Sequence, residues 1–317
     1  MMNNITLLAF AISFAAGVIL CVALIPVLHR LNFGQQVREE GPQAHLKKSG
    51  TPTMGGIMIV IAMMAGCVFF VRGNIDMAII LVITFIFAII GFLDDFLKIL
   101  KHQSEGLKAW QKMGLQIIAA AALVLYVGLA TDSATTTIIP FYGVVDLGGW
   151  FYPLAIVAVL GTVNGANFTD GLDGLASSVT GVICIFLASA SAVLGAGLEA
   201  PAFALFGALL AFLLFNSYPA RVFMGDTGSL ALGGFVAVMA LLMRIPIFLI
   251  IFAFVYLAEI ISVILQVGYF KLTHGKRIFK MAPIHHHFEL SGWSETRTVT
   301  LFTVTTVICC IIAYLGL

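Results

Sequence analysis

The sequence predicts an all-α polytopic membrane protein in which ten transmembrane helices form a single domain over residues 1–317. Two observations lead to this fold class. First, 61% of the residues are hydrophobic and only 10% are charged, whereas soluble domains carry about 25% charged residues. Second, the apolar residues form runs close to the roughly 20 residues that a helix needs to cross the hydrocarbon core. A soluble fold of this length could not bury so much apolar surface, so lipid must surround the protein.

Each apolar run is expected to form one helix. The first begins in MMNNITLLAF, which lacks the positive residues of a secretory signal and is therefore expected to remain as a span. The predicted spans are residues 5–28, 53–71, 76–93, 113–130, 151–167, 174–195, 201–216, 227–243, 247–270 and 297–315.

The distribution of lysine and arginine predicts how these spans are oriented. An even number of spans places both termini on the same side of the membrane. One set of connecting loops holds nearly all the basic residues, and the other set holds only Arg72 and Arg244. Short loops rich in Lys and Arg stay in the cytoplasm. Both termini are therefore expected to be extracytoplasmic, and the cytoplasmic loops to be residues 29–52, 94–112, 168–173, 217–226 and 271–296.

One loop on the predicted outer side is expected to contain β-structure. The segment TTTIIPFYGVVDLGG, residues 135–149, alternates in part between apolar and polar residues and contains glycines. This pattern is typical of a small β-hairpin.

Two adjacent carboxylates interrupt the apolar segment FAIIGFLDDFLKIL, residues 87–100. Asp94 and Asp95 lie at the cytoplasmic end of the third predicted span. Successive helical residues point about 100° apart, so the two side chains are expected to leave the helix in different directions. Asp94 and Lys98, four residues apart, share a face. Two interpretations remain open: a functional carboxylate pair, or an ion pair at headgroup level that merely ends the helix.

A second motif is NGANFTDGLDGLASS, residues 164–178. Asn167 and Asp170 are able to cap a helix, and Gly171 permits close approach of the backbone. Asp170 and Asp173 are three residues apart and would share one face of a helix. A helix N-terminus here would offer free N–H groups to an anion. The alternative is a plain glycine-rich turn between spans.

The third motif is FNSYPARVFMGDTGSLALGG, residues 215–234. Asn216 closes the seventh predicted span, and Asp226 stands where the eighth begins. Phe223 lies in a polar loop, where an aromatic ring is available for stacking on a base. Capping by Asp226 and packing by Phe223 is the alternative interpretation.

The fourth motif, KMAPIHHHFELSGWSE, contains three consecutive histidines, His285, His286 and His287. Adjacent histidines in a structured loop rarely converge on one metal ion, so anion contact or proton transfer suits them better.

Other charged residues allow two interpretations each. Lys47 and Lys48, and Lys108 and Lys112, flank predicted spans; they either bind phosphate or only obey the orientation rule. Glu259, in FVYLAEIISVILQ, is the carboxylate that lies well inside a predicted span. Such residues suggest function, but packing, or a bent helix that brings Glu259 to water, also remains open.

Acidic, Asn, His and Lys clusters from five separate loops converge on one membrane face. Five carboxylates there suggest Mg²⁺, which binds hard oxygens and bridges phosphates. The five cysteines lie inside apolar runs, show no metal-binding spacing and are expected to be small hydrophobic residues. The formal net charge of +1 gives no indication of nucleic-acid binding. The constellation describes a nucleotide-diphosphate site that opens to lipid.

These motifs resemble the bacterial phospho-N-acetylmuramoyl-pentapeptide transferases, in the superfamily of polyprenyl-phosphate N-acetylhexosamine-1-phosphate transferases. The similar segments are HLKKSGTPTMGG, GFLDDFLK, NFTDGLDGLA, FNSYPARVFMGDTGSLALG and MAPIHHHFE, in family order over residues 30–317. The resemblance implies transfer of phospho-MurNAc-pentapeptide from UDP-MurNAc-pentapeptide to undecaprenyl phosphate, with release of UMP, at the cytoplasmic face of the bacterial plasma membrane. It also implies Mg²⁺ as cofactor and a homodimer.

The resemblance further implies roles for individual residues. Asp94 and Asp95 match the essential aspartate pair, Asp226 the Mg²⁺ ligand and His285 the essential histidine. Phe223 would stack on the uracil, and Asp173 would read its edge. The implied nucleotide contacts are Lys48, Asn167, Asp170, Gly171, Leu172, Asp173, Asn216, Phe223 and Gln266. Further predicted substrate contacts are Thr53, Lys98, Lys112, His286 and His287.

Two other functions compete with this one. A related transferase that uses another sugar nucleotide, such as UDP-GlcNAc, is the closer alternative. A secondary transporter would suit the many spans and Glu259, but transporter sites lie near the bilayer midplane and often show repeat symmetry. Here the polar residues cluster at one face, and no repeat is evident in the sequence.

Overall fold

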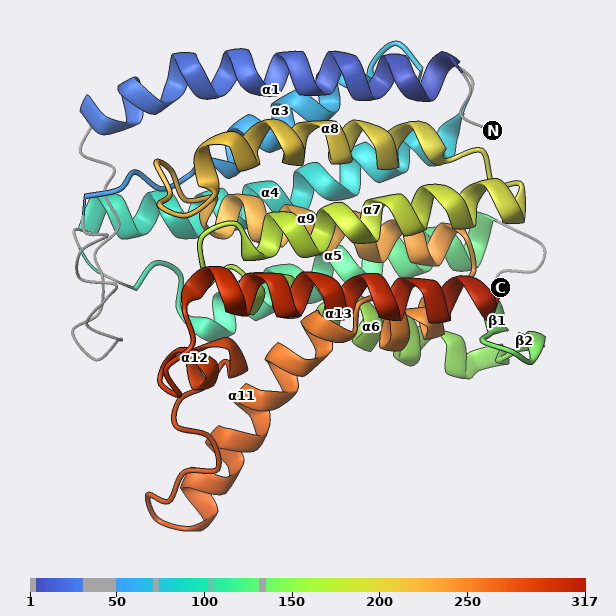
Figure 1. The fold of residues 1–317 in the computed structure, drawn as a ribbon. Helices are drawn as coiled ribbons and strands as arrows, with labels where there is room; N and C mark the ends of the chain where they lie inside the picture. Colours follow the sequence, from blue (N-terminus) through green and yellow to red (C-terminus); the bar gives the residue numbers. More distant parts are fainter. Residues whose placement is uncertain (1–3, 31–49, 71–73, 102, 104, 131–134) are drawn as a thin grey trace.

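The structure, a computed structural model, describes residues 4–30, 50–70, 74–101, 103, 105–130 and 135–317. Long helices run side by side in a bundle, and β1 and β2 form a hairpin at one end of it (Figure 1). Within the described residues, nine helices are long and apolar enough to cross a membrane. This confirms a largely helical, multi-pass membrane fold. The nine are α1 (Asn4–Arg30), α4 (Ile75–Lys101), α5 (Ala109–Ala130), α6 (Phe151–Thr169), α7 (Leu175–Leu194), α8 (Glu199–Asn216), α9 (Gly225–Leu242), α11 (Phe254–Leu272) and α13 (Glu295–Leu315).

The second predicted span, residues 53–71, is helical only in α3 (Gly56–Cys67). Twelve residues of helix extend about 18 Å, less than the roughly 30 Å hydrocarbon core. Met54 has a φ of +70° just before the helix, and residues 68–70 form a turn after it. The helix is therefore shorter at both ends than its apolar run.

The ninth predicted span, residues 247–270, is broken. It consists of the 3₁₀ turn η2 (Pro246–Phe248), one turn of helix in α10 (Leu249–Phe252), and then α11. The break falls at Ala253, whose ψ of +26° is not helical. After it, α11 runs obliquely to the other helices, and its carboxyl end projects from the bundle (Figure 1). The short helix α12 (Ile284–Glu289) lies between α11 and the start of α13.

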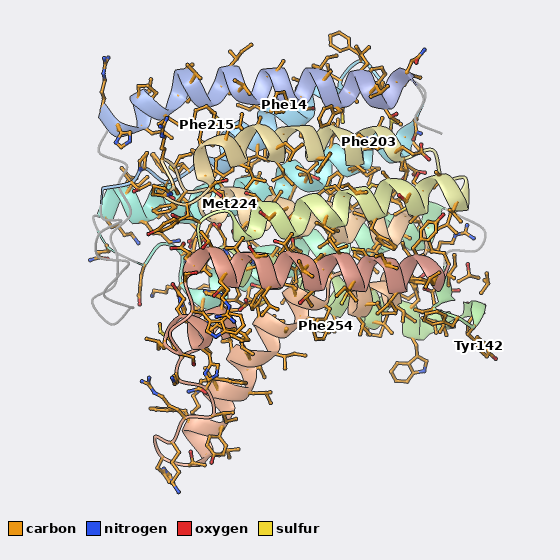
Figure 2. All side chains as sticks on the ribbon, viewed as in Figure 1. Phe14, Tyr142, Phe203, Phe215, Met224 and Phe254 are labelled. Carbon is orange, nitrogen blue, oxygen red and sulfur yellow. The ribbon has the colours of Figure 1, made fainter. Side chains whose placement is uncertain are left out.

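Helix α9 forms the centre of the bundle, since every residue from Thr227 to Leu241 is buried. Side chains fill the spaces between helices, and Met224, just before α9, is fully buried (Figure 2). An ideal Cβ at Gly56 of α3 would lie 2.1 Å from the amide nitrogen of Gly228 in α9. Only glycine permits this approach, and it brings α3 against the first turn of α9.

The predicted hairpin is confirmed. Strand β1 (Thr136–Ile139) pairs antiparallel with β2 (Gly143–Asp146), with Thr136 opposite Asp146. The hairpin is held to the bundle by two main-chain hydrogen bonds: the amide of Ile138 donates to the Arg244 carbonyl, and the amide of Phe141 to the Gly316 carbonyl. It therefore lies at the end of the bundle that holds the carboxyl terminus, opposite α12 (Figure 1).

Candidate active site

Helix α4 lies very close to the start of α9 because Gly91 has no side chain. An ideal Cβ at Gly91 would lie 2.0 Å from the main-chain oxygen of Asp226, which no real side chain tolerates. Asp94 and Asp95 stand three and four residues later in α4, on the face that Gly91 presents to α9. The close approach at Gly91 thus carries both carboxylates to Asp226.

Asp94, Asp95 and Asp226 form one group, called the carboxylate cluster below. One oxygen from each residue lies within 4.8 Å of the others. Asp94 and Asp95 are each only 3% exposed, whereas the Asp226 side chain is 17% exposed. Three carboxylates this close repel one another unless cations and hydrogen-bond donors compensate their charge.

Two lysines supply positive charge to the carboxylate cluster. The Lys98 Nζ lies 2.6 Å from Asp94 Oδ2 and 2.8 Å from Asp226 Oδ2. The Lys112 Nζ, from α5, lies 2.8 Å from the same Asp226 oxygen. The predicted contact between Asp94 and Lys98 is confirmed. Lys98 lies in the last turn of α4, so the pair does stand at the end of the helix, but Lys98 also contacts Asp226 of α9.

Hydrogen-bond donors complete the surroundings of the cluster. Asp95 Oδ2 accepts hydrogen bonds from the Thr227 hydroxyl at 2.7 Å and the Thr227 amide at 2.9 Å. Asp95 Oδ1 accepts one from the Asp226 amide at 3.1 Å. Asp95 therefore caps free amides at the start of α9 from another helix. The Asn167 side-chain amide, at the end of α6, donates to Asp226 Oδ1 and to the Ser229 hydroxyl, both at 2.7 Å.

The turn between α6 and α7 (residues 170–174, the α6–α7 turn below) is held to the loop before α9. Asp173 Oδ2 accepts a hydrogen bond from the Ala220 amide at 2.9 Å. Asn216 Oδ1 accepts one from the Gly174 amide at 3.1 Å, and its side-chain amide donates to the Val222 carbonyl at 2.9 Å. The segment is thus a turn between α6 and α7, as one interpretation predicts, and Asn216 fixes it to the loop before α9.

His285 of α12 packs directly on the same turn. An ideal Cβ at Gly171 would lie 2.1 Å from His285 Nε2, so a side chain at Gly171 would displace the imidazole. The His285 ring is 1% exposed. Its Nδ1 lies 3.1 Å from Oε2 of Glu259, which is completely buried in α11. Glu259 therefore belongs to the surroundings of His285, a link that the sequence did not reveal.

Asp170 begins this turn, close to several other carboxylates. Burial, followed by the negative charges of Asp226, Asp95 and Asp173, raises the pKa of Asp170 well above its ordinary value. Negative charge is thus concentrated between the turn and the carboxylate cluster. A cation, or a ligand that carries one, would be attracted to this region.

The remaining predicted site residues are distributed as follows. Thr53 lies beside Asp95 and Gly225. The main chain of Phe223 pairs with the segment before α3, and its side chain is partly exposed. The Leu172 side chain is in the core, so only its main chain could meet a substrate. Lys48 lies outside the described residues.

Three further predicted site residues make contacts within the region from α11 to α12. They are Gln266, His286 and His287. Gln266 Oε1 accepts hydrogen bonds from the amides of Ile278 and Phe279 at 3.1 and 2.9 Å. The His286 ring contacts Glu289 Oε2 at 2.7 Å, and His287 Nδ1 accepts from the Lys280 amide at 3.1 Å. These contacts hold His285 and its neighbours in place over the α6–α7 turn.

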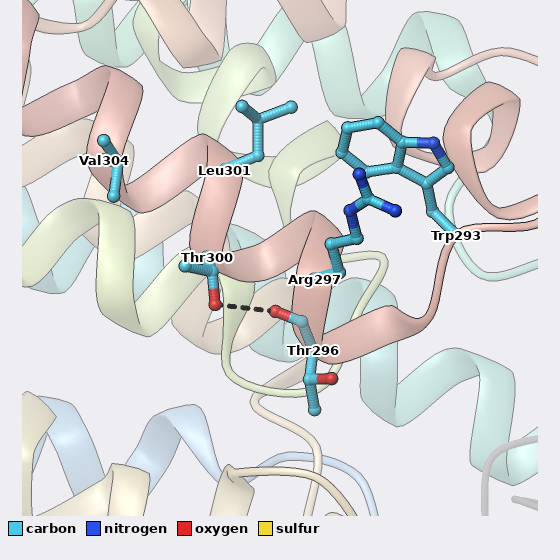
Figure 3. A pocket seen from close by; sticks show the side chains of 6 residues that line it. All are labelled: Trp293, Thr296, Arg297, Thr300, Leu301 and Val304. Carbon is cyan, nitrogen blue, oxygen red and sulfur yellow. Dashed lines mark hydrogen bonds between the residues drawn. The ribbon is translucent and has the colours of Figure 1, made fainter.

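A groove of about 550 Å³ lies elsewhere, along α13 (Figure 3). Arg297 lies over the Trp293 ring, with its guanidinium carbon 4.0 Å from the ring centroid. None of the predicted site residues lines this groove, and it contains no carboxylate. The groove and the carboxylate cluster are therefore separate places in the structure. The lining residues are Trp293, Thr296, Arg297, Thr300, Leu301 and Val304.

Comparisons with known proteins identify the family. Residues 77–244 match the family described as Glycosyl transferase family 4, and residues 48–60 match the Phospho-N-acetylmuramoyl-pentapeptide-transferase signature 1. A Phospho-N-acetylmuramoyl-pentapeptide-transferase of Clostridium perfringens (strain SM101 / Type A) is 50% identical over 314 residues, which are 98% of this chain and 96% of the relative. The transferase of that name from Clostridium botulinum (strain Alaska E43 / Type E3) is 47% identical over 320 residues, 100% of this chain and 98% of the relative. The chain therefore belongs to the phospho-N-acetylmuramoyl-pentapeptide-transferase family.

Proposed function

We propose that this protein transfers phospho-MurNAc-pentapeptide from UDP-MurNAc-pentapeptide to undecaprenyl phosphate. The products are undecaprenyl-diphospho-MurNAc-pentapeptide and UMP. Family membership over nearly the whole chain supports this function. The single structural observation that carries it is the carboxylate cluster together with Lys98 and Lys112. Hard oxygens and ammonium groups side by side suit a reaction in which two phosphate groups meet.

The donor set of the carboxylate cluster fits Mg²⁺, which prefers carboxylate oxygens and keeps substrate phosphates among its ligands. Asp226 would hold the ion, because it is the most exposed of the three carboxylates. When bound, Mg²⁺ neutralises charge on the diphosphate. Lys98 and Lys112 contact phosphate oxygens in this scheme, and Asn167 orients Asp226 through its hydrogen bond.

The nucleotide is proposed to bind between the α6–α7 turn and the loop before α9. The partly exposed Phe223 stacks on the uracil, and Asp173 reads the edge of the base. His285, seated on Gly171, contacts a phosphate oxygen of the nucleotide. Other residues complete the proposed substrate site, either by direct contact with the substrate or by supporting the walls of the site. They are Lys48, Thr53, Asn216, Gln266, His286 and His287.

The reaction is proposed to be a single in-line displacement. A phosphate oxygen of undecaprenyl phosphate attacks the β-phosphorus of the UDP-sugar, and the bond from this phosphorus to the bridging oxygen breaks, releasing UMP. A phosphate monoester has a second pKa near 6, so at pH 7 the nucleophile is largely deprotonated. Asp94 and Asp95 therefore need only orient the nucleophile and its surroundings, with modest assistance as a base.

A covalent phospho-sugar intermediate on Asp94 or Asp95 is the rival scheme. Lipid-free enzyme is incubated with UDP-MurNAc-pentapeptide and Mg²⁺, and both UMP and the mass of the protein are measured. Release of UMP only after undecaprenyl phosphate is added supports direct transfer. A stoichiometric burst of UMP with a phospho-sugar adduct on either aspartate refutes it.

The proposed topology has ten spans, the second of which contains α3, with both termini extracytoplasmic and the carboxylate cluster facing the cytoplasm of a bacterium. A homodimer in the plasma membrane is part of the proposal. Reporter fusions should place the loops 29–52 and 271–296 inside and the loop 131–150 outside. An externally accessible 271–296 loop would remove the basis for a cytoplasmic site.

The decisive assay for the function is UMP release by purified protein with undecaprenyl phosphate and Mg²⁺. UDP-MurNAc-pentapeptide and UDP-GlcNAc are compared as donors. Turnover with UDP-MurNAc-pentapeptide and not with UDP-GlcNAc is the expected result. Preference for UDP-GlcNAc would assign the chain to a related reaction, and no release with either donor would refute a transferase.

A further inference from the structure

Glu259 and His285 form a pair that is sealed from solvent. Their side chains are 0% and 1% exposed, and Glu259 Oε2 lies 3.1 Å from His285 Nδ1. Across the residues that the structure describes, neither carboxylate oxygen and neither ring nitrogen makes an aligned hydrogen bond. The contact is therefore one of proximity, with Glu259 Oε2 and His285 Nδ1 facing each other inside the protein.

Such burial demands an explanation. Removing an ionised carboxylate from water costs several kcal/mol, which is recovered only when a partner of opposite charge or a proton donor lies against it. Ser262, one turn along α11, donates to the main-chain oxygen of Glu259 and not to its carboxylate. His285 is thus the group that compensates Glu259.

The imidazole is oriented by contacts on its other edges. Gly171 lies against the Nε2 edge, where an ideal Cβ would be 2.1 Å from Nε2 and 2.5 Å from Cε1. The His286 ring lies on one side, with the two ring centroids 4.1 Å apart. The ring therefore turns Nδ1 toward Glu259 and Nε2 toward the α6–α7 turn.

We propose that Glu259 is a positioning residue for His285. Its carboxylate lies 3.1 Å from Nδ1 and fixes the orientation of the ring, so that the Nε2 edge stays against Gly171 and the imidazole supports the α6–α7 turn at the proposed nucleotide site. This inference rests on the proposed function. It gives the buried glutamate a defined part in the reaction without any contact to the substrate.

The test compares Glu259→Gln, Glu259→Asp and Glu259→Leu with Ser262→Ala as the matched control on the same helix. UMP release is measured over a range of UDP-MurNAc-pentapeptide concentrations. Loss of the carboxylate partner that orients a histidine costs about 10–100-fold in metal sites, which sets the scale here. Glu259→Gln is expected to lower kcat by about that factor and to change KM less. Glu259→Leu should lose more activity and Glu259→Asp less, while Ser262→Ala keeps the wild-type kcat.

A double-mutant cycle with His285→Gln separates positioning from a purely structural role. If Glu259 acts through His285, Glu259→Gln adds no further loss to His285→Gln. Independent, additive losses, with equal falls in thermal stability for Glu259→Gln and Ser262→Ala, would overturn the proposal.

The ring itself provides a second readout that needs no turnover. In protein labelled with ¹⁵N-histidine, the His285 signals are assigned by their loss in His285→Gln. Glu259→Gln, which keeps a polar group in the cavity, should shift these signals, whereas Ser262→Ala should not. Unchanged His285 signals, or wild-type kcat in Glu259→Gln, would refute the positioning role and leave the proposed function intact. Wild-type protein that releases no UMP would instead refute the function itself.

Discussion

The carboxylate cluster and the Glu259–His285 pair both bury ionisable side chains. The two regions differ in the contacts that compensate this burial. In the cluster, Asp94, Asp95 and Asp226 share two lysines and several hydrogen-bond donors. In the pair, one carboxylate meets one imidazole. The cluster has many compensating contacts, whereas the pair has essentially one.

Exposure separates the two regions further. The side chains of Asp226, Lys112 and Lys98 are 17%, 18% and 32% exposed, so a ligand from solution is able to reach them. The pair is closed to solvent. A site that exchanges ligands needs contacts that are replaceable, and the cluster provides them. A group that must keep one orientation needs enclosure, and the pair provides that.

The largest effect is expected for Asp226→Asn, at the exposed centre of the cluster. UMP release should fall by at least about 100–1000-fold, the scale on which loss of one transition-state contact acts, because the proposed Mg²⁺ ligand is gone. The fold should persist, because asparagine keeps the size of the side chain and an oxygen that accepts hydrogen bonds from Lys98 and Lys112. Asp146→Asn in the hairpin, at the opposite end of the bundle, is the control and should leave activity unchanged.

The metal part of this prediction is checked separately. Excess EDTA should abolish UMP release by the wild type, and added Mg²⁺ should restore it. Substantial turnover by Asp226→Asn, or activity that EDTA does not diminish, would show that the cluster is not a metal site.

The next effect concerns the pair. Gly171→Ala places a Cβ where the imidazole of His285 now lies, 2.1 Å from Nε2. The ring must move, and a misplacement of about 1 Å costs on the order of 100-fold in rate. Gly161→Ala, in α6, meets no atom within 4 Å and serves as the control. Equal kcat in the two variants would mean that His285 tolerates displacement and that the pair does not define its position.

Part of this comparison was predictable from sequence. The polar motifs, the contact of Asp94 with Lys98 and the hairpin follow from local spacing, which the chain reveals directly. The convergence of Asp94 and Asp95 was not predictable, because adjacent helical residues point in different directions. It depends on the close approach of α4 and α9 at Gly91, a contact between helices far apart in sequence.

The same limit explains the other differences. Glu259 is unusual in the sequence, but its partner His285 lies beyond the rest of α11 and the segment that leads to α12, so no spacing rule connects the two. The break at Ala253 lies inside a continuous apolar run, and hydropathy does not detect it. Thr227 stands in a recognised motif, yet its bond to Asp95 requires the tertiary fold. Local chemistry was predictable, and its assembly between helices was not.

A smaller effect is expected when one donor is removed from the cluster. Thr227→Val replaces the hydroxyl that donates to Asp95 with a methyl group of similar size. A hydrogen bond to a charged group contributes about 1.5–3 kcal/mol, and the lower end applies because Asp95 keeps two amide donors. The melting temperature in detergent should fall by several degrees. Thr300→Val, on the exposed face of α13, should not change it. An unchanged melting temperature in Thr227→Val would show that the cluster's contacts are redundant for stability.

The smallest effect is a pH dependence of stability that distinguishes the two ends of the bundle. Burial and neighbouring carboxylates raise the pKa of Asp170, so the folded protein binds this proton more tightly than the unfolded chain does. The resulting stabilisation is complete below the ordinary carboxyl pKa and is lost as pH rises through the raised pKa.

In metal-free buffer, the melting temperature should therefore decline as pH rises through that window, and Asp170→Asn should flatten the decline. Asp170 keeps some exposed surface, so solvent screening keeps the change in melting temperature small.

The pKa shift of Asp146 has the opposite sign. The hydrogen bonds from the Thr135 hydroxyl and the Gly148 amide lower its pKa, so its contribution is present above the ordinary pKa and is lost only as pH falls through the lowered one. Asp146→Asn should leave the decline at higher pH intact. If Asp170→Asn declined as steeply as the wild type, the negative charge around the α6–α7 turn would be compensated already, and the contrast between this end of the bundle and the hairpin end would fail.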